Sequence, residues 1–411
     1  MRQIFILFSI VCSFGIFSCE QNKPFTEVTS SAAVQVDSLP GTCPYLTKDN
    51  KGNTVLSWVR DLNDSSSIFC YAVSADGGQT FGKPIIIPSS TNVHPHSENL
   101  PKVIFKPSGE VVAVWGVSNP NPLNKYSGLV NYSQSFDDGK TWTEAKPLVK
   151  DTAGYDQRYS DIALLSNGEI AIVWLDNRIT TAKDGAALYF ASTNGRNGFE
   201  QEKLISQPCC ECCRTDLFVD KRNNIHVLYR GIIEDSIRDM VHTVSVDAGK
   251  TFSEPKQIND DHWVLNGCPH TGPAMTENEA GLHFAWFTGG GKSGSFYTRT
   301  TDNGTSFTGY DSISHVGRHP QLASFPDGEL IIVWDEAVAH RNQLNKRIGL
   351  QIRTAQGTNI KTDYITADTV FSSYPVVSAL GKSSSLVAYC KKEGEKSYIM
   401  YQRVLVAGRP A

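Results

Sequence analysis

The sequence has 411 residues, of which 40% are hydrophobic, so it is long enough for two or three ordinary domains or one large repeat domain. Its formal net charge is −4 and its charged residues are interspersed without a basic tract, which gives no reason to expect a nucleic-acid partner. No stretch beyond the N-terminal segment has the roughly 20 apolar residues that a membrane-spanning helix needs.

The N-terminal segment predicts export. Residues 1–18 place one arginine before an apolar run and then small residues, which is the layout of a secretory signal peptide. Ile16 to Cys19 resembles the lipobox of bacterial lipoproteins, in which the cysteine becomes lipidated; the alternative is ordinary signal cleavage nearby. We therefore expect an exported lipoprotein anchored through Cys19, in the periplasm or on the cell surface, with residues 19–40 as a tether that also holds a possible closing strand.

A short pattern, Ser/Thr-x-Asp-x-Gly-x-Thr-aromatic, recurs after extended apolar runs. The Asp side chain accepts hydrogen bonds from the amides of its own turn, Gly supplies a positive φ, and the aromatic ring packs on the core beneath. The copies read SADGGQTF (74–81), SFDDGKTW (135–142), SVDAGKTF (245–252) and TTDNGTSF (300–307), with a degenerate copy, STNGRNGF, at 192–199. Each copy predicts a hairpin turn.

A longer pattern of two apolar strands around a turn interleaves with this one. Its seven copies span residues 43–61, 100–116, 159–178, 214–230, 272–287, 319–336 and 374–390, and their starts lie 47 to 59 residues apart. That spacing suits four strands per unit, the size of a propeller blade. Five tryptophans occupy the same place late in the second strand and are predicted to pack between blades: Trp58, Trp115, Trp174, Trp286 and Trp334.

The short pattern resembles the Asp box, or BNR repeat, of sialidases and related β-propellers. The sequence therefore predicts an all-β chain with one propeller domain over residues 41–411, built from four-stranded blades. The repeat count favours seven blades, and the sialidase resemblance leaves six as the alternative. Residues 32–38 could supply the outer strand that the last unit lacks, which would close the ring and remove exposed sheet edges. We expect a monomer.

The resemblance implies a site where the loops that lead into the innermost strands gather at one end of the central channel. Sialidases hold the sugar carboxylate with three arginines and attack with a tyrosine activated by a glutamate, while an aspartate serves as acid and base, and they need no cofactor. Here the plausible carboxylate-binding arginines are Arg158, Arg214, Arg230 and Arg318. Tyr374 lies where the nucleophile would, and Glu211, Asp61 and Asp176 are the candidate carboxylates. An enzyme of this type would be an exo-α-sialidase-like glycoside hydrolase.

The sequence departs from sialidases at one place. The Arg-Ile-Pro motif that opens their first blade is missing, and Cys43 stands there instead, in GTCPYL. An arginine clamp would have to be built from the other blades. A non-catalytic propeller that binds glycans therefore remains an alternative, because a fold does not by itself imply a function.

Cysteines give a second hypothesis. CCECCRTD (209–216) and NGCPHTGP (266–273) lead into adjacent units, so a soft ligand set suited to copper(I) or zinc could converge. Its members would be Cys43, Cys209, Cys210, Cys212, Cys213, Cys268 and His270. Disulfides are the alternative, because exported chains meet oxidising conditions, and a reactive thiol is the third. The predicted partners are thus a glycan or glycoconjugate and, through the N-terminal lipid alone, a membrane, with no nucleic acid.

Overall fold

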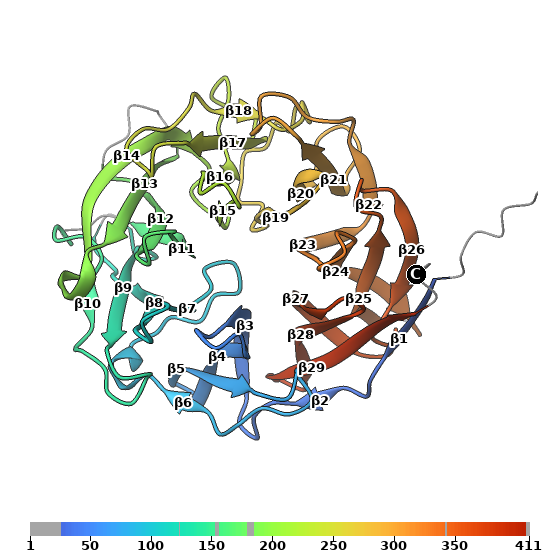
Figure 1. Cartoon of the computed structure of the whole chain (residues 1–411), viewed down its shortest axis with the longest axis horizontal. Coiled ribbons are helices and arrows are strands. Elements are labelled where there is room, and N and C mark those ends of the chain that lie inside the picture. Colours follow the sequence, from blue (N-terminus) through green and yellow to red (C-terminus); the bar gives the residue numbers. More distant parts are fainter. Residues whose placement is uncertain (1–25, 123, 153–155, 179–184, 342, 408–411) are drawn as a thin grey trace, which may run out of the picture.

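The computed structural model describes residues 26–122, 124–152, 156–178, 185–341 and 343–407, which form a ring of β-sheets around a central axis (Figure 1). The predicted signal peptide and Cys19 lie outside the described residues. The only helical segments among the described residues are two 3-10 turns, η1 (Pro88–Ser90) and η2 (Gly195–Asn197). Within this part of the chain, no helix is long and apolar enough to cross a lipid bilayer.

Five sheets are four-stranded antiparallel blades, as the all-β propeller prediction requires. Blade one holds β3 (Gly41–Lys48), β4 (Thr54–Asn63), β5 (Ser66–Ser74) and β6 (Ile85–Ile86). Blade two holds β7 (Lys102–Phe105), β8 (Val111–Ser118), β9 (Gly128–Ser135) and β10 (Lys146–Pro147). Blade three holds β11 (Gln157–Leu164), β12 (Ile170–Asp176), β13 (Ala186–Thr193) and β14 (Phe199–Cys209). Blade four holds β15 (Asp216–Val219), β16 (Ile225–Arg230), β17 (Met240–Ser245) and β18 (Lys256–Gln257). Blade five holds β19 (Ala274–Asn278), β20 (Gly281–Thr288), β21 (Gly294–Thr300) and β22 (Asp311–Ser314).

The rest of the ring is one nine-stranded sheet, which we call the closing sheet. Its strands from the C-terminal part of the chain are β23 (Gly317–Ser324), β24 (Leu330–His340), β25 (Gln343–Arg353), β26 (Asn359–Tyr364), β27 (Phe371–Gly381), β28 (Ser384–Glu393) and β29 (Lys396–Ala407). The prediction of seven separate four-stranded blades is therefore wrong, and the alternative of six is not met either. The reason is the length of the β24–β25 hairpin. It runs far enough for Lys346 to pair in parallel with Phe371 of β27, which joins the sixth and seventh repeat units into one sheet.

Two N-terminal strands complete the closing sheet. β1 (Glu27–Ser30) and β2 (Val34–Gln35) both pair with β29, so the first and last described strands lie side by side (Figure 1). Blade one then packs against the closing sheet through an apolar cluster that includes Trp58 and Leu386. The N-terminal and C-terminal parts of the described chain thus meet in one sheet, which joins the first and last parts of the ring.

The Asp-box turns form as their residue pattern predicts. In the third copy, the Ser245 hydroxyl donates to Asp247 Oδ1 at 2.7 Å, and the Thr251 amide donates to the same oxygen at 2.8 Å. The Thr251 hydroxyl donates to Asp247 Oδ2 at 2.6 Å. Equivalent bonds surround Asp76, Asp137 and Asp302. These donors lower the pKa of Asp137, chiefly through the Thr141 amide, to about 2. The turns are local and exposed, so they shape blade edges and carry no site.

The five aligned tryptophans pack between blades, which confirms their predicted role. All five are at most 1% exposed. Each lies in a cluster with the preceding unit; Trp286, for example, contacts the group of apolar residues that contains Leu228 and Met240 of blade four. Each buried indole N–H also finds a side-chain acceptor, as Trp286 does with Asp261 Oδ2 at 2.7 Å. The tryptophans thus combine a large apolar contact with one satisfied polar group.

Replacing one of these tryptophans should destabilise the ring more than replacing an Asp-box tryptophan. We expect Trp286→Ala to lower the free energy of unfolding by about 3–5 kcal/mol, because it empties a closed interblade cavity. Trp142→Ala is the matched control, since Trp142 is only partly buried beside its turn. Urea unfolding monitored by circular dichroism would measure both, and equal losses would contradict the assignment.

Candidate functional site at the channel mouth

Several inner strands have, within their first four residues, one residue in the left-handed backbone region. Cys43, Tyr159, His319 and Tyr374 have φ between 52° and 60°, and each sits at an irregularity in the pairing of its inner strand. His270, just ahead of β19, has φ 48°. This conformation is costly for residues other than glycine, of the order of 1 kcal/mol or more each, and such residues cluster at functional sites. The backbone therefore marks one level of the ring, which we call the channel mouth.

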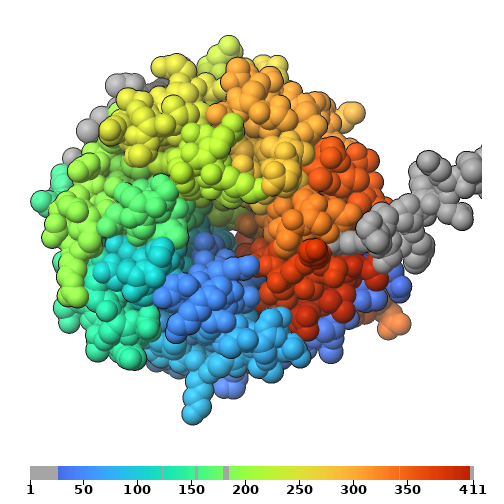
Figure 2. Space-filling model, viewed as in Figure 1, coloured from blue at the N-terminus to red at the C-terminus, as the bar shows by residue number. Residues whose placement is uncertain are grey.

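The loops of blades two, three and five converge at the mouth. The His96 ring lies 5.9 Å from the Tyr159 ring and 5.8 Å from the His270 ring, centroid to centroid. These three side chains line a pocket of about 430 Å³, which we call the mouth pocket. Its other lining residues are His94, Asn99, Gly116, Val117, Ser118, Lys125, Tyr126, Ser127, Gly128 and Arg158. The predicted gathering of inner-strand loops is confirmed for these blades, and Figure 2 shows the central hollow around which the blades meet.

A second pocket of about 270 Å³ adjoins the first and extends it to blade four. It shares Tyr126, Arg158, Tyr159 and His270 with the mouth pocket. Glu211, Cys212 and Cys268 also line it, which brings the cysteine stretch to the same end of the ring. Together the two pockets form a groove whose walls carry imidazole, phenol, guanidinium and thiol groups.

Electrostatics set the protonation states of the groove. Burial, reinforced by the neighbouring His270, lowers the pKa of His96, so its imidazole is neutral at pH 7. Burial raises the pKa of Tyr159, so its phenol stays protonated. A neutral imidazole can accept a proton and a phenol can donate one, and the two rings lie side by side in the pocket wall in an edge-to-face contact, with their planes at 85°.

Tyr374 stands beside a histidine–aspartate pair. Its ring centroid lies 4.3 Å from that of His319, whose Nδ1 is 2.7 Å from Asp335 Oδ2. The Tyr374 amide donates to the same carboxylate oxygen at 2.9 Å, and this bond holds the backbone near the start of β27. Burial, together with the charges of Glu98 and Asp335, raises the pKa of the Tyr374 phenol. The group next to the predicted nucleophile is therefore an imidazole oriented by a carboxylate.

Of the four predicted arginines, only Arg158 lines the groove. Arg214 is 4% exposed; its Nη1 lies 3.2 Å from Glu98, and its Nη2 donates to the carbonyls of Gly272 and Pro273. Arg230 is 1% exposed and donates to the carbonyls of Arg238, Thr271 and Phe287. Arg318 is exposed and stacks on Phe287 at 4.7 Å. The side chains of Arg214 and Arg230 thus hold neighbouring loops through their carbonyl groups. Contact of these two arginines with a substrate stays a prediction.

The three candidate carboxylates lie apart from one another. Glu211 is exposed on the second pocket. Asp61 accepts the Ser67 hydroxyl at 3.0 Å and lines a separate pocket of about 700 Å³. Asp176 is fully buried, receives the Trp174 indole N–H at 3.3 Å and pairs with Arg178 at 3.2 Å. The structure does not bring these carboxylates together around Tyr374.

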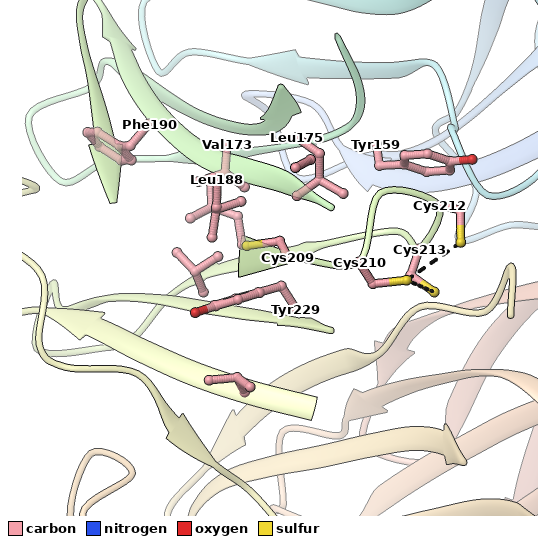
Figure 3. Close-up of a cluster of buried hydrophobic side chains, with 14 of the residues drawn as sticks. Tyr159, Val173, Leu175, Leu188, Phe190, Cys209, Cys210, Cys212, Cys213 and Tyr229 are labelled. Atoms are coloured by element: carbon pink, nitrogen blue, oxygen red, sulfur yellow. Dashed lines mark hydrogen bonds between the residues drawn. The ribbon is translucent and has the colours of Figure 1, made fainter. Parts of the chain in front are cut away.

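The eight described cysteines comprise a cluster of three, the exposed Cys268, and four thiols in the apolar core: Cys43, Cys70, Cys209 and Cys390. Figure 3 shows the stretch from Cys209 to Cys213. Cys210, Cys212 and Cys213 are buried and their sulfur atoms all lie within 4.8 Å of one another. Cys209 turns the other way, into the apolar core with Leu188 and Tyr229. Burial raises the pKa of Cys43 to about 11, and this thiol lies in the core of blades one and two. Cys268 is exposed, and with His270 it lines the second pocket. All eight described cysteines are free thiols, so the structure forms none of the predicted disulfides.

A buried charge network lies on the inner strands and joins blades two, three and four. Lys102 Nζ is 2.5 Å from Asp161 Oδ1, and the Leu217 amide donates to Asp161 Oδ2 at 2.8 Å. Asp216, on the same inner layer, accepts the Met275 amide at 2.7 Å. Burial, reinforced by the charge of Asp161, raises the pKa of Asp216 to about 7.

The fold of this chain is similar to that of several solved structures, although their sequence identities to it are low. No known protein family and no curated protein matches the sequence. Among solved structures, a protein of unknown function from Dyadobacter fermentans has a TM-score of 0.52 at 15% identity, covering 92% of this chain and 99% of its own. An intramolecular trans-sialidase from Ruminococcus gnavus has a TM-score of 0.52 at 10% identity, covering 78% of this chain and 96% of its own. The polysaccharide lyase Uly1 has a TM-score of 0.53 at 11% identity, covering 90% of each chain. The structural neighbours thus include propeller sialidases at low sequence identity.

Sequence reasoning did not select Tyr159, Tyr126 or Asn99 as site residues. The signal for Tyr159 is present in the repeats, because it takes the same first position in its copy as Cys43, His319 and Tyr374 take in theirs. Tyr126 and Asn99 lie on loops outside the repeat pattern, and no periodicity marks them.

The raised pKa of Asp216 predicts a pH dependence of stability. In the unfolded chain this carboxyl ionises near its ordinary pKa of about 4, whereas in the folded protein it keeps its proton up to about pH 7. The folded state therefore binds more protons between these pH values, and stability falls as the pH rises through that window. Asp216→Asn should remove this part of the dependence. Urea unfolding at pH 5 and pH 8 would test it, and identical pH profiles for wild type and variant would contradict it.

Proposed function

We propose that this protein is an exported, lipid-anchored propeller of the cell envelope that binds and processes an acidic glycan in the mouth pocket. The observation that carries the proposal is the grouping of Arg158 with Tyr126, Tyr159, His96 and His270 around one pocket of about 430 Å³. That volume falls in the range of small-molecule sites, about 300–1,000 Å³. It suits a sugar ring with a carboxylate.

Each lining group has a function in this proposal. Arg158 supplies the positive charge, and its Nε is set by Asp156 Oδ1 at 2.5 Å. Tyr126 is 70% exposed at the pocket rim, where its ring can stack on a sugar face. Lys125 adds a second cation beside it. Among the described residues, the lining of the mouth pocket holds these two cations and no carboxylate, so its local charge would attract an acidic ligand although the net charge of the protein is −4.

Two reaction classes use these residues differently. In the sialidase-like class, Tyr374 would attack the anomeric carbon of a sialoside, giving its phenolic proton to a neighbouring base such as His319. The bond from that carbon to the glycosidic oxygen would break, and the leaving oxygen would take up a proton from water. In the second class, β-elimination from a uronic acid residue, neutral His96 would remove the proton next to the carboxyl group. The C4–O4 bond would break, a C4–C5 double bond would form, and the Tyr159 phenol would protonate the leaving oxygen. The contact between the His96 and Tyr159 rings favours the second class, and the structural similarity to a polysaccharide lyase supports it.

Loss of the Arg158 charge should weaken glycan binding. We expect Arg158→Gln to lower the affinity for an acidic oligosaccharide roughly 10- to 100-fold, because a charge-assisted hydrogen bond is lost. Arg196→Gln is the matched control, since Arg196 lies on the outside of the ring over Phe136. Binding would be measured by calorimetry on a panel of sialylated and uronate-containing oligosaccharides. Equal affinities for both variants, or no binding across the panel, would refute the proposal.

The two reaction classes respond to different substitutions. Under the elimination reading, His96→Asn should lower kcat on a uronate polymer by about 100-fold or more, with an unsaturated product detected by ultraviolet absorbance in the wild type. Tyr374→Phe should then leave most of the activity. Release of free sialic acid that depends on Tyr374 and survives His96→Asn would instead establish the sialidase-like class.

A further inference from the structure

Beyond the glycan site, we propose that Cys210, Cys212 and Cys213 form a three-thiolate site for a soft metal ion, copper(I) or zinc, in the wall of the groove. The Cys210 sulfur lies 3.6 Å from that of Cys212 and 3.9 Å from that of Cys213. Sulfur ligands about 2.3 Å from one ion lie about 3.8 Å apart in a tetrahedral site and about 4 Å apart in a trigonal one. These two distances thus already fit ligands of a single ion, and all three sulfur atoms lie within 4.8 Å of one another.

The spacing does not fit a disulfide. A disulfide bond holds two sulfur atoms about 2.05 Å apart, much closer than either measured distance. Three thiols also cannot all pair with one another, so one would remain. Cys209 cannot serve as the partner, because its side chain points into the core on the other side of the strand (Figure 3).

The backbone around the cluster is held on both sides. The Cys210 amide donates to the Arg230 carbonyl at 2.8 Å, and Cys209 bridges Gly231. After the cluster, Arg214 is fixed by the carbonyls of Gly272 and Pro273. The ligands would therefore need little rearrangement to bind an ion. Arg230 also lies close enough to Cys210 and Cys213 to interact electrostatically with both, and its positive charge would balance part of the negative charge of a thiolate site.

One side of the cluster opens on the groove. Cys212 lines the second pocket together with Cys268 and His270, two of the residues predicted as ligands. Cys43 lies in the core of blades one and two. Cys209 is not one of the three cysteines whose sulfur atoms gather within 4.8 Å of one another, so neither residue is available as a ligand. Copper(I) is satisfied by three thiolates, whereas zinc takes four ligands and would draw its fourth from Cys268 or His270. Binding of copper(I) can therefore be distinguished from binding of zinc, because only zinc would need the fourth ligand.

The test is metal binding by the chain purified under anaerobic, reducing conditions without a His tag, titrated separately with copper(I) and with Zn²⁺ against a chromogenic competitor. We expect about one ion per chain. Cys210→Ser and Cys213→Ser should each weaken binding by at least the 10- to 100-fold that is typical for the loss of an outer partner. Cys209→Ala is the matched control, because it removes a thiol from the same stretch but not from the cluster, and it should leave affinity unchanged. Cys268→Ser or His270→Ala, whichever removes the fourth ligand, should weaken the binding of Zn²⁺ and not that of copper(I).

Three further measurements on the unsubstituted protein test the site even if a variant unfolds. Co²⁺ added to the wild type should give thiolate charge-transfer absorbance, which only sulfur ligation produces, and the bound ion should raise the melting temperature. No stoichiometric binding by the reduced wild type, or binding that Cys210→Ser leaves unchanged, would overturn the site. Alkylation followed by mass spectrometry of the exported protein is the last measurement. A disulfide at Cys210, Cys212 or Cys213 would also overturn the proposed metal site.

Discussion

The buried ion pair between Glu98 and Arg214 holds the channel mouth together. Glu98 comes from the loop before blade two, Arg214 from the loop before blade four, and the Gly272 amide of the next loop donates to Glu98 at 2.7 Å. Two charges this deeply buried are tolerated only when their remaining hydrogen-bonding groups are satisfied, as the carbonyls of Gly272 and Pro273 do for Arg214. Removing one partner of such a pair costs about 3–5 kcal/mol, so the pair contributes strongly to holding the loops that carry His96, Cys213 and His270.

The repeat explains why chemistry gathers at this level. The first position of the repeat copies gives Cys43, Tyr159, Arg214, His319 and Tyr374, and these residues surround the mouth. The third position, two residues further along the same inner strands, gives Lys102, Asp161 and Asp216, and these form the buried charge network. Because successive strand residues alternate sides and the strands run alike in each blade, one alignment of the copies sorts the ring into levels. The outer strands and Asp boxes repeat without reaching either level.

Features of the fold that depend on residues close together in the sequence could be predicted. Features that depend on pairing between residues far apart in the sequence could not. The Asp boxes, the interblade tryptophans and the all-β propeller follow from residue patterns that act over a few positions. The blade count failed because a single pairing, Lys346 with Phe371, depends on how far the β24–β25 hairpin extends, and no periodicity encodes that length. The cysteines were recognised as a group, but the direction of each side chain depends on the strand pairing around it. Cys209 closes β14 and faces the core, whereas Cys210 begins the loop. For the same reason, the sequence could suggest four arginines, but only the packed ring shows that two of them are bound by carbonyl groups.

The thiol cluster and the mouth pocket are connected through covalent and hydrogen-bonded neighbours. Cys213 precedes Arg214, Arg214 holds Glu98, and the backbone of the Glu98 loop places His96 in the pocket. On the other side, Cys212 and Arg158 line the same second pocket. An ion bound by the three thiolates would restrain residues 210–213 and, through Arg214, the loop that carries His96. Glycan binding and metal binding would then favour the same arrangement of loops, since both are served by a rigid mouth. This is a local coupling of two neighbouring sites by shared residues, and it needs no change in the rest of the ring.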